Sequence, residues 1–349
     1  NYMPVIKTAR PGLLMRIATT LAFALCSASQ LAVAMPAPSW VKSIPVGQWR
    51  AVRSEVTAAD IDPRIDEDVN PKFPKATPYE GATGYRALWE AWNSGVFAKT
   101  LGPCGSILYF GGGRDYLGNQ VVALNVCGGS NGTPVWQRLS SPYPGTAALP
   151  NPLGRYADNT PIPPHTFDLL SFDSKNNSLV LAQSLGGDRS LANVPMAWAF
   201  DLGARAWRGP FKHRGATNGV SAFDTKRGLT WFQPEQNSPG ELTSLDASRG
   251  SLRYFGWPKA NGIGEAGSMM GYDPIRDRLV MTSFRSIPGV ISERRLDLPN
   301  SPWVIAQQER APARTWSQHA FVWSQSRKAW IVWMSNGGGQ VYEVRYKGL

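Results

Sequence analysis

One short phrase recurs along this chain of 349 residues. An apolar run ends in an aromatic residue followed by Asp, a polar turn comes next, and a second apolar run follows. The phrase reads LLSFDSKNNSLVLAQS at 169–184, VSAFDTKRGLTWFQP at 220–234, MMGYDPIRDRLVMTSF at 269–284 and AFVWSQSRKAWIVWM at 320–334. Strands and turns that repeat at intervals of about fifty residues are typical of radially arranged sheets. The repeat therefore predicts an all-β chain folded as a β-propeller of four-stranded blades.

The number of blades depends on two segments near the start of the chain. The last repeat, which begins near Gln318, lacks an outer strand, and the run SWVKSIPVGQW at 39–49 has the Trp and Pro of outer strands elsewhere. We expect this N-terminal strand to pair into the last blade and close the ring. The Pro-rich acidic stretch 58–80 is either a degenerate sixth blade or a long insertion. Five to seven blades are expected, with six or seven favoured.

The first 34 residues have the composition of an export signal peptide. Lys7, Arg10 and Arg16 come without any acidic residue, an apolar stretch covers 17–25, and A-V-A stands at 32–34. This order predicts cleavage near Met35. The remaining 35–349 then form a single propeller domain, with loop insertions near 58–80 and 141–164.

Two other readings of this leader are a membrane anchor and a lipoprotein signal. The apolar stretch is shorter than the roughly 20 residues that span a bilayer. A lipoprotein needs a small residue before Cys26, where Leu25 stands. We therefore expect a periplasmic or secreted protein without an integral membrane segment after removal of the signal.

Charge and cysteine content fit an exported protein. The formal charge is +11, and arginine binds carboxylates and sulfates in a bidentate manner, so an acidic polysaccharide is a natural partner. The alternative is that turns such as TKRG and PIRDR simply place solvated charges. Nucleic acid is not an expected partner of an exported protein. Cys104 and Cys127 remain after the leader, and in an oxidising compartment we expect them to form a disulfide; the alternative is two separate buried thiols.

A resemblance to a known family adds detail. The run LYFGGGRDYLGNQVVALNV at 108–126, followed by Trp136, resembles the kelch-type unit of galactose oxidase-like β-propellers, and NGGGQVYEV at 336–344 repeats part of it. Gly111, Gly112 and Gly113 allow positive φ and close backbone packing at a strand end. In such propellers the residues just before each innermost strand gather around the central channel.

This resemblance implies a set of candidate site residues from five separate segments. Possible catalytic residues are His165, His319, Asp168 and Glu265, and possible ligand-binding residues are Glu90, Trp92, Asn93, Asn218, Trp316 and Gln318. Two imidazoles, carboxylates and aromatic rings can perform acid/base chemistry or hold a sugar ring. The alternative for each residue is that it caps or packs its own strand.

Neither a cofactor nor a metal site is expected. The run GGGRDYLG is followed by a strand where a phosphate-binding loop needs a helix. The acidic residues between Asp60 and Asp68 lack the spacing and the glycine of a calcium loop. The copper site of galactose oxidase needs two histidines, two tyrosines and a crosslinked cysteine. This chain has only three histidines, and its two cysteines after the leader are expected to pair with each other, so copper oxidase chemistry is not expected.

Two functions therefore remain after the sequence analysis. The leading hypothesis is an exported propeller that binds a glycan, possibly acidic, or a protein on one face of the disc. The competing hypothesis is a carbohydrate-active enzyme, a lyase or mutarotase, that acts on an acidic sugar with His165 or His319 as base. Both activities occur on similar propellers, so the fold cannot decide between them.

Overall fold

The structure is a computed structural model in which residues 50–53, 87–90, 92–143, 154–182, 196–212, 219–234, 242–255, 268–283, 290–298, 301–308, 319–324, 329–336 and 340–347 are described. The backbone alone is described at 50–53, 90, 114, 131, 283, 307–308 and from 319 onward. All these residues belong to 37–349, one of two compact units of the chain.

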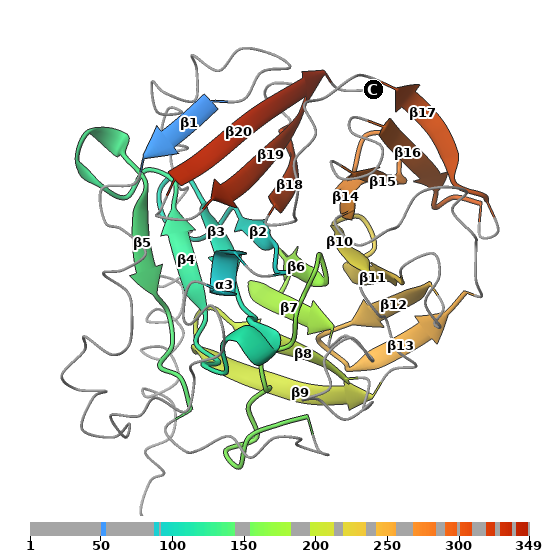
Figure 1. The fold of residues 1–349 in the computed structure, drawn as a ribbon. Helices are drawn as coiled ribbons and strands as arrows, with labels where there is room; N and C mark the ends of the chain where they lie inside the picture. The colour runs from blue at the N-terminus through green and yellow to red at the C-terminus, as the bar shows by residue number, and fades with distance from the viewer. Residues whose placement is uncertain are drawn as a thin grey trace, which may run out of the picture. The chain divides into compact units, whose positions relative to one another are not determined.

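Four-stranded antiparallel sheets are arranged as the blades of a propeller (Figure 1). Blade 1 consists of β2 (Gly95–Ala98), β3 (Ser106–Tyr109), β4 (Val122–Asn125) and β5 (Val135–Arg138). Blade 2 consists of β6 (Leu170–Asp173), β7 (Ser178–Ala182), β8 (Met196–Asp201) and β9 (Ala206–Lys212). Blade 3 consists of β10 (Val220–Asp224), β11 (Leu229–Gln233), β12 (Thr243–Asp246) and β13 (Ser251–Tyr254). Blade 4 consists of β14 (Ser268–Asp273), β15 (Arg278–Ser283), β16 (Val290–Arg295) and β17 (Val304–Gln308).

A further sheet joins the two ends of the described chain. It contains β18 (His319–Ser324), β19 (Ala329–Asn336), β20 (Gln340–Lys347) and β1 (Arg50–Arg53), and β1 pairs antiparallel with β20. The pairing strand lies just after 39–49, the run that the sequence suggested, and 39–49 itself lies outside the described residues. The described strands form five sheets, fewer than the six or seven blades favoured by the sequence, and the candidate sixth blade at 58–80 is not among the described residues.

Helical structure among the described residues is short. The α-helix α3 (Ala87–Glu90) precedes β2, and the 3-10 helices η5 (Gly113–Asp115) and η6 (Ser130–Gly132) lie in loops of blade 1. None of the helices in the described part of the chain is long and apolar enough to cross a membrane.

The Asp of the repeated phrase stabilises a tight turn at the end of the innermost strand in blades 2, 3 and 4. In blade 2, Asp173 Oδ1 accepts hydrogen bonds from the backbone N–H groups of Lys175 and Asn176, both at 3.0 Å. Asp224 and Asp273 make the corresponding bonds in blades 3 and 4. A carboxylate that accepts from the backbone two and three residues on forms an Asx-turn, which fixes the hairpin locally.

The sheets pack face to face through their central strands. In β7, Leu179 and Leu181 belong to the apolar cluster shared with blade 1, whereas Val180 and Ala182 belong to the cluster shared with blade 3. Successive side chains of a strand point to opposite faces, so a blade with neighbours on both faces needs an uninterrupted apolar strand. This explains why the central strands of the repeats are continuous apolar runs rather than alternating ones.

The glycine triplet of the kelch-like run lets two backbones approach closely. Gly111 has φ of 135°, and a Cβ placed there would lie 2.3 Å from Asn93 Oδ1. The same Asn93 oxygen accepts from the backbone N–H of Thr166 at 2.9 Å. The glycine thereby holds the segments before β2 and β6 together, which agrees with a structural role for the triplet.

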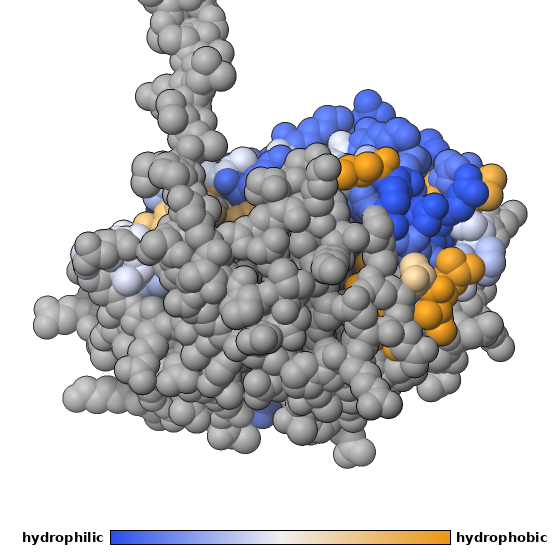
Figure 2. All heavy atoms as spheres, turned by 90° about the horizontal axis from the view of Figure 1, so that it is seen from above, coloured by the Kyte–Doolittle hydropathy of each residue, from blue (hydrophilic) through white to orange (hydrophobic). Residues whose placement is uncertain are grey.

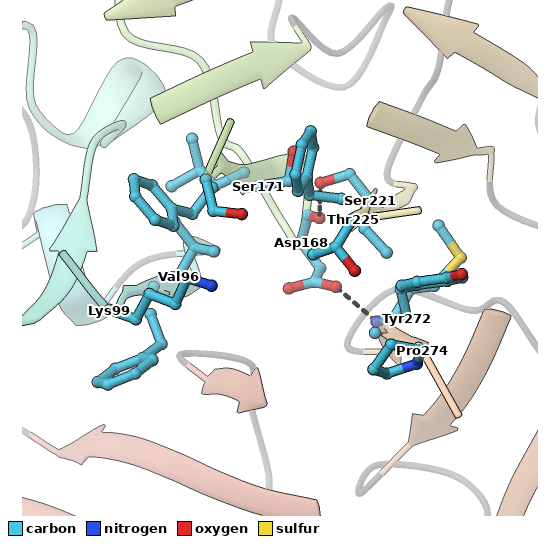
Figure 3. A pocket seen from close by; sticks show the side chains of 17 residues that line it. Val96, Lys99, Asp168, Ser171, Ser221, Thr225, Tyr272 and Pro274 are labelled. Carbon is cyan, nitrogen blue, oxygen red and sulfur yellow. Dashed lines mark hydrogen bonds between the residues drawn. The ribbon is translucent and has the colours of Figure 1, made fainter. Parts of the chain in front are cut away.

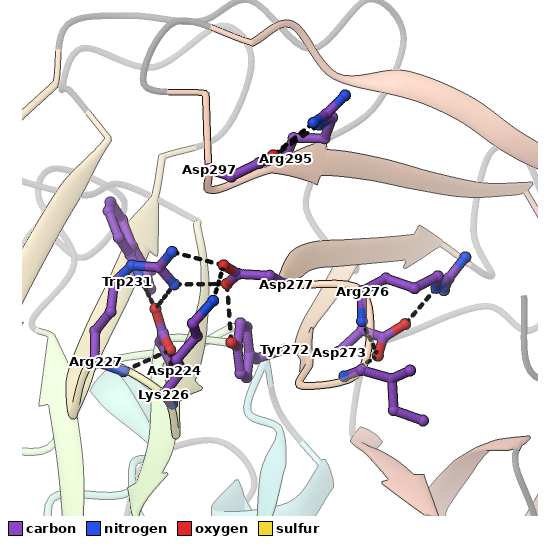
Figure 4. A network of polar contacts seen from close by, with 11 residues as sticks. Asp224, Lys226, Arg227, Trp231, Tyr272, Asp273, Arg276, Asp277, Arg295 and Asp297 are labelled. Atoms are coloured by element: carbon purple, nitrogen blue, oxygen red, sulfur yellow. Dashed lines mark hydrogen bonds and ion pairs between the residues drawn. The ribbon is translucent and has the colours of Figure 1, made fainter.

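Polar contacts tie the turns of blades 3 and 4 to each other (Figure 4). Arg227 donates to both carboxylate oxygens of Asp277, at 2.6 and 2.8 Å, and Lys226 Nζ lies 2.7 Å from the same carboxylate. The Arg227 guanidinium holds the pKa of Asp277 well below its usual range. A bidentate pair of this kind adds geometric specificity to the contact between blades.

Apolar side chains also reach the surface. Ile275, Leu298, Val304 and Ile305 are exposed. Figure 2 shows one side of the molecule, on which apolar groups lie beside a strongly hydrophilic surface.

The predicted disulfide is confirmed. Cys104 and Cys127 are bonded, with their Cα atoms 5.8 Å apart and a sequence separation of 23 residues. The bond connects the segment just before β3 to the segment just after β4, each cysteine lying two residues from its strand, and so links two strands of blade 1.

Removing this bond should destabilise the protein. We expect the Cys104→Ser, Cys127→Ser double variant to unfold with a free energy lower by about 2–4 kcal/mol, because the unfolded chain regains the entropy of an open loop. Chemical unfolding of both proteins, followed by circular dichroism, measures the difference. Identical midpoints for the variant and the wild type, and for the wild type with and without reductant, would show that the bond contributes no stability.

Candidate functional site

A cavity of about 400 Å³ lies among the innermost strands of four blades (Figure 3). Its walls come from β2, β6, β10 and β14 and from the turn residues that follow them. The innermost strands run around the centre of the propeller (Figure 1). The cavity is therefore the central channel of the disc.

The repeated aromatic residue lines this channel. One such residue stands next to the last position of each innermost strand, and the four are Phe97, Phe172, Phe223 and Tyr272. Phe97 and Phe223 are half-buried, so part of each ring remains accessible. The sequence analysis used this aromatic residue only as a mark of the scaffold. Its role in lining a cavity was missed, although its regular recurrence before the turn was the available signal.

Hydroxyl groups lie between these rings. Ser171, Ser174, Ser221 and Thr225 all line the channel. Ser221 donates to the backbone oxygen of Asp168 at 3.0 Å, and Ser171 Oγ lies 3.4 Å from Thr230 Oγ1. Aromatic faces next to hydroxyl donors and acceptors make a surface that suits a molecule with both C–H faces and hydroxyl groups.

Asp168 carries the only carboxyl group among the described residues that line this channel. The side chain accepts a hydrogen bond from the backbone N–H of Met270 at 2.7 Å (Figure 3). It also accepts one from Ser94 Oγ at 3.0 Å. One carboxyl group of blade 2 thus contacts blade 1 on one side and blade 4 on the other. Its position is fixed by three blades together.

Burial changes the chemistry of this carboxyl group. Asp168 is 5% exposed, and burial raises the pKa of its carboxyl well above the ordinary range, against the lowering effect of the hydrogen bonds from Met270 and Ser94. A buried carboxyl group disfavours its charged form. A titratable group with a strongly shifted pKa in a central cavity is a candidate for a functional role.

The channel becomes more exposed from the starts of its strands to their ends. Asp168 and Ser221 are buried, whereas Lys99, Thr225 and Pro274, which follow the strand ends, are exposed. The accessible end therefore lies at the Asx-turns. The site proposed from the sequence lay at the other ends of these strands, and Asp168 is the residue of that set that lines the cavity.

His165 forms a second polar pair outside the channel lining. Its Nε2 lies 2.8 Å from Asp115 Oδ2, and both side chains are largely buried. The imidazole packs near the rings of Trp92 and Phe167, each with its centroid 6.4 Å away. Asp115 lies in η5, 50 residues from His165 along the chain, so no local pattern identified this partner.

The remaining predicted residues fall into two groups. Asn93 is fully buried; its side-chain amide donates to the backbone oxygen of Ala87 at 2.5 Å, and its side-chain oxygen accepts from the hydroxyl of Thr166. Trp92 is half-buried and has φ of 55°. Both lie beside the segment before β6. The other positions are described as backbone only or lie outside the described residues, and they are Glu90, Asn218, Glu265, Trp316, Gln318 and His319.

No group of three or more His, Cys, Asp or Glu side chains that could hold a metal ion is present in the described part of the chain. This absence applies only to metal ligands that protein side chains supply.

Comparisons with known proteins show no family. No protein-family model matches the chain, and no curated protein does. Similar solved structures include the Malassezia sympodialis allergen Mala s 1, with 11% identity, a TM-score of 0.43, and coverage of 75% of this chain and 79% of the allergen.

Two bacterial structures are similar to the same extent. TolB from Acinetobacter baumannii has 10% identity and a TM-score of 0.40, and an auxiliary nutrient binding protein from Bacteroides ovatus has 11% and 0.38. The matches cover 73% and 75% of this chain but only 54% and 62% of those proteins. The chain thus matches less than two thirds of the length of either. Such distant likeness carries no argument about function, and the kelch-type resemblance stays a prediction.

Asp168 gives the stability of the protein a pH dependence of defined sign. Because its pKa is raised, the folded protein keeps this proton at pH values where the unfolded chain, with a carboxyl pKa of about 3.9, has lost it. The unfolded chain then binds fewer protons, so stability falls as pH rises from about 4 through the raised pKa. We expect Asp168→Asn, which does not titrate, to show a shallower fall of melting temperature over this window.

The wild type serves as the reference at every pH. Asp277 acts in the opposite direction, because its lowered pKa contributes stability above the ordinary carboxyl range that is lost as pH falls below it. The contribution of Asp277 is the same in the wild type and in Asp168→Asn, so the difference between their curves of melting temperature against pH reports Asp168 alone. Parallel curves would mean that the Asp168 carboxyl titrates alike in the folded and unfolded chains.

Proposed function

We propose that this protein is a binding module that takes part of a glycan into the central channel from the face of the Asx-turns. The observation that carries the proposal is the ring of aromatic side chains from four blades with hydroxyl groups between them. Sugars bind through the stacking of C–H faces on aromatic rings and through hydrogen bonds from their hydroxyl groups. The cavity of about 400 Å³ falls within the range of about 300–1,000 Å³ usual for small-molecule sites.

The polar groups of the channel support this ligand class. Asp168 with a raised pKa can donate a proton in a hydrogen bond, and the hydroxyl groups of Ser174 and Thr225 can both donate and accept. Lys99 at the exposed end adds positive charge, which favours a sugar that carries a carboxylate. A concave cavity is a less suitable surface for a protein partner, which usually needs a broad interface.

We also infer that the ring consists of five blades and closes through β1. Support comes from the pairing of β1 with β20 and from the contacts of β18 with both β2 and β14. A strand from one end of the chain in the sheet at the other end leaves no unpaired gap in the ring.

Export to the periplasm or the outside of the cell is part of the same proposal. The disulfide between Cys104 and Cys127 supports it, because such bonds persist in oxidising compartments. The leader sequence predicts the same location.

A panel of neutral and acidic polysaccharides tests the proposed function. We expect saturable binding of one class to the full chain, and Phe223→Ala should weaken it about three- to tenfold, as the loss of about 0.5–1.5 kcal/mol of aromatic contact implies. Phe211→Ala is the matched control, because Phe211 is a half-buried phenylalanine of the outer strand β9, away from the channel. Calorimetry measures both constants.

Absence of binding to every polysaccharide would refute the glycan proposal and direct the search to protein partners. Equal weakening by the two phenylalanine variants would place the glycan outside the channel.

One observation favours the second candidate function, a lyase or mutarotase that acts on an acidic sugar. The short contact between His165 and Asp115 can orient an imidazole as a general base. In this case incubation with a uronate-containing polysaccharide should yield unsaturated products with new ultraviolet absorbance, or altered anomeric equilibration. His165→Gln, whose amide can still donate to Asp115, should abolish the product while binding remains. Binding without turnover in the wild type would exclude this activity for the sugars tested.

A further inference from the structure

The outermost strand of blade 4, β17, differs from the outer strands of the other described sheets. These outer strands are β1, β5, β9, β13 and β17, and among the described strands each has a neighbour on one side alone (Figure 1). The free edge of such a strand presents backbone N–H and C=O groups with which another extended segment can pair. The side chains of each outer strand therefore decide whether its edge invites or opposes a further strand.

Positive charge occurs in every described outer strand except β17. The other four strands carry at least one arginine or lysine each, and these residues are Arg50, Arg53, Arg138, Arg208, Lys212 and Arg253. Charged side chains on an edge strand oppose the addition of another strand. In contrast, β17 reads VIAQQ and contains neither a charged residue nor a proline. Its edge therefore lacks the protection that charge gives to the other four.

Two aliphatic side chains of β17 face solvent. Val304 is 53% exposed and Ile305 is 60% exposed. Both stay in register with β16, opposite Glu293 and Ser292, and the register shift of this strand pair begins only after Ile305. The exposed pair thus belongs to the regular part of the edge.

The positions of these two side chains indicate how a partner covers them. Val304 and Ile305 are successive residues of a strand, so their side chains lie on opposite faces of the sheet. A partner that docks flat on the blade covers one face and leaves the other exposed. A further strand beside β17 places a cross-strand neighbour next to both side chains. The exposure pattern therefore favours the addition of a strand.

The absence of charge in β17 also indicates which strand is added. When two copies of one strand pair antiparallel about a two-fold axis, each side chain lies close to residues of the identical strand. An arginine or lysine in that strand then meets a like charge, which destabilises the pair. Among the described outer strands, β17 is the one that can pair with its own copy without this repulsion.

We propose that two copies of this protein associate through antiparallel pairing of their β17 strands about a two-fold axis near Ile305. The contact uses the same edge in both copies, so assembly ends at a dimer. It does not depend on the proposed glycan site. The described lining of the central channel contains no residue of β17, which lies at the outer rim of the propeller (Figure 1).

The net charge of the chain determines how this association responds to salt. Each copy carries a formal charge of +11, so two copies repel each other at long range. Salt screens this repulsion, whereas the uncharged β17 strands form no ion pair that salt can weaken. The dimer should therefore become more stable as ionic strength rises, which is the opposite of the response expected for binding of an acidic glycan.

Sedimentation velocity of the full chain over a range of concentrations tests the proposal. We expect a reversible equilibrium between monomer and dimer that shifts toward the dimer as salt rises. Ile305→Lys should weaken the dimer by about tenfold or more, because it removes apolar burial and places two like charges at one contact. Ser251→Lys is the matched control, because it adds the same charge at an exposed position of the outer strand β13. Circular dichroism checks that both variants keep the native fold.

A cysteine variant tests the two-fold geometry directly. Ile305→Cys should form a disulfide-linked dimer under mild oxidation, seen by non-reducing electrophoresis, whereas Ser251→Cys should form no more than the wild type. The wild type accounts for any product of Cys26, the cysteine outside the disulfide of blade 1. A wild type that stays monomeric, equal effects of the two lysine variants, or equal cross-linking of the two cysteine variants would each overturn the proposal. Open-ended aggregates in place of a dimer would overturn the two-fold contact.

Discussion

The central strands of blades 2 and 3 bury both of their faces, and this constraint organises the molecule. A sheet buried on one face alone can rest on a helix or a second sheet, but here blade 2 packs between blades 1 and 3, and blade 3 packs between blades 2 and 4. In β7 and β8 one face meets blade 1 and the other meets blade 3. Twisted sheets packed in this way converge at their innermost strands, and the side chains of those strands leave the central channel between them.

The sequence predicted much of the scaffold because its signals are local. The aromatic-Asp pair before a polar turn marks an Asx-turn that involves residues only two and three positions apart, so each repeat reveals its own hairpin. The disulfide was predictable because two cysteines of an expected exported chain flank one strand pair. The pairing of β1 was harder to locate, because its described part is only Arg50–Arg53 and its partner lies at the far end of the chain.

The candidate site was harder to predict because its contacts join distant segments. Asp168 was chosen from its place before a strand, and it does line the cavity, but its bond to the Met270 backbone spans 102 residues and leaves no trace in local composition. The pairing of His165 with Asp115 spans 50 residues in the same way. A second cleft is lined by residues of blades 3 and 4, so turn motifs such as TKRG showed charge without showing that Arg227, Arg253 and Arg294 share one surface.

The long span of the Asp168 contacts also bears on how the protein acquires its structure. The Asx-turn hairpins use neighbouring residues, so they can form early and one at a time, whereas contacts of high sequence separation carry a larger entropic cost of closure. The bonds from Ser94 and Met270 to Asp168 require blades 1, 2 and 4 to be in place together. The central channel is therefore complete only once these blades have assembled around one another, however well each blade has formed by itself.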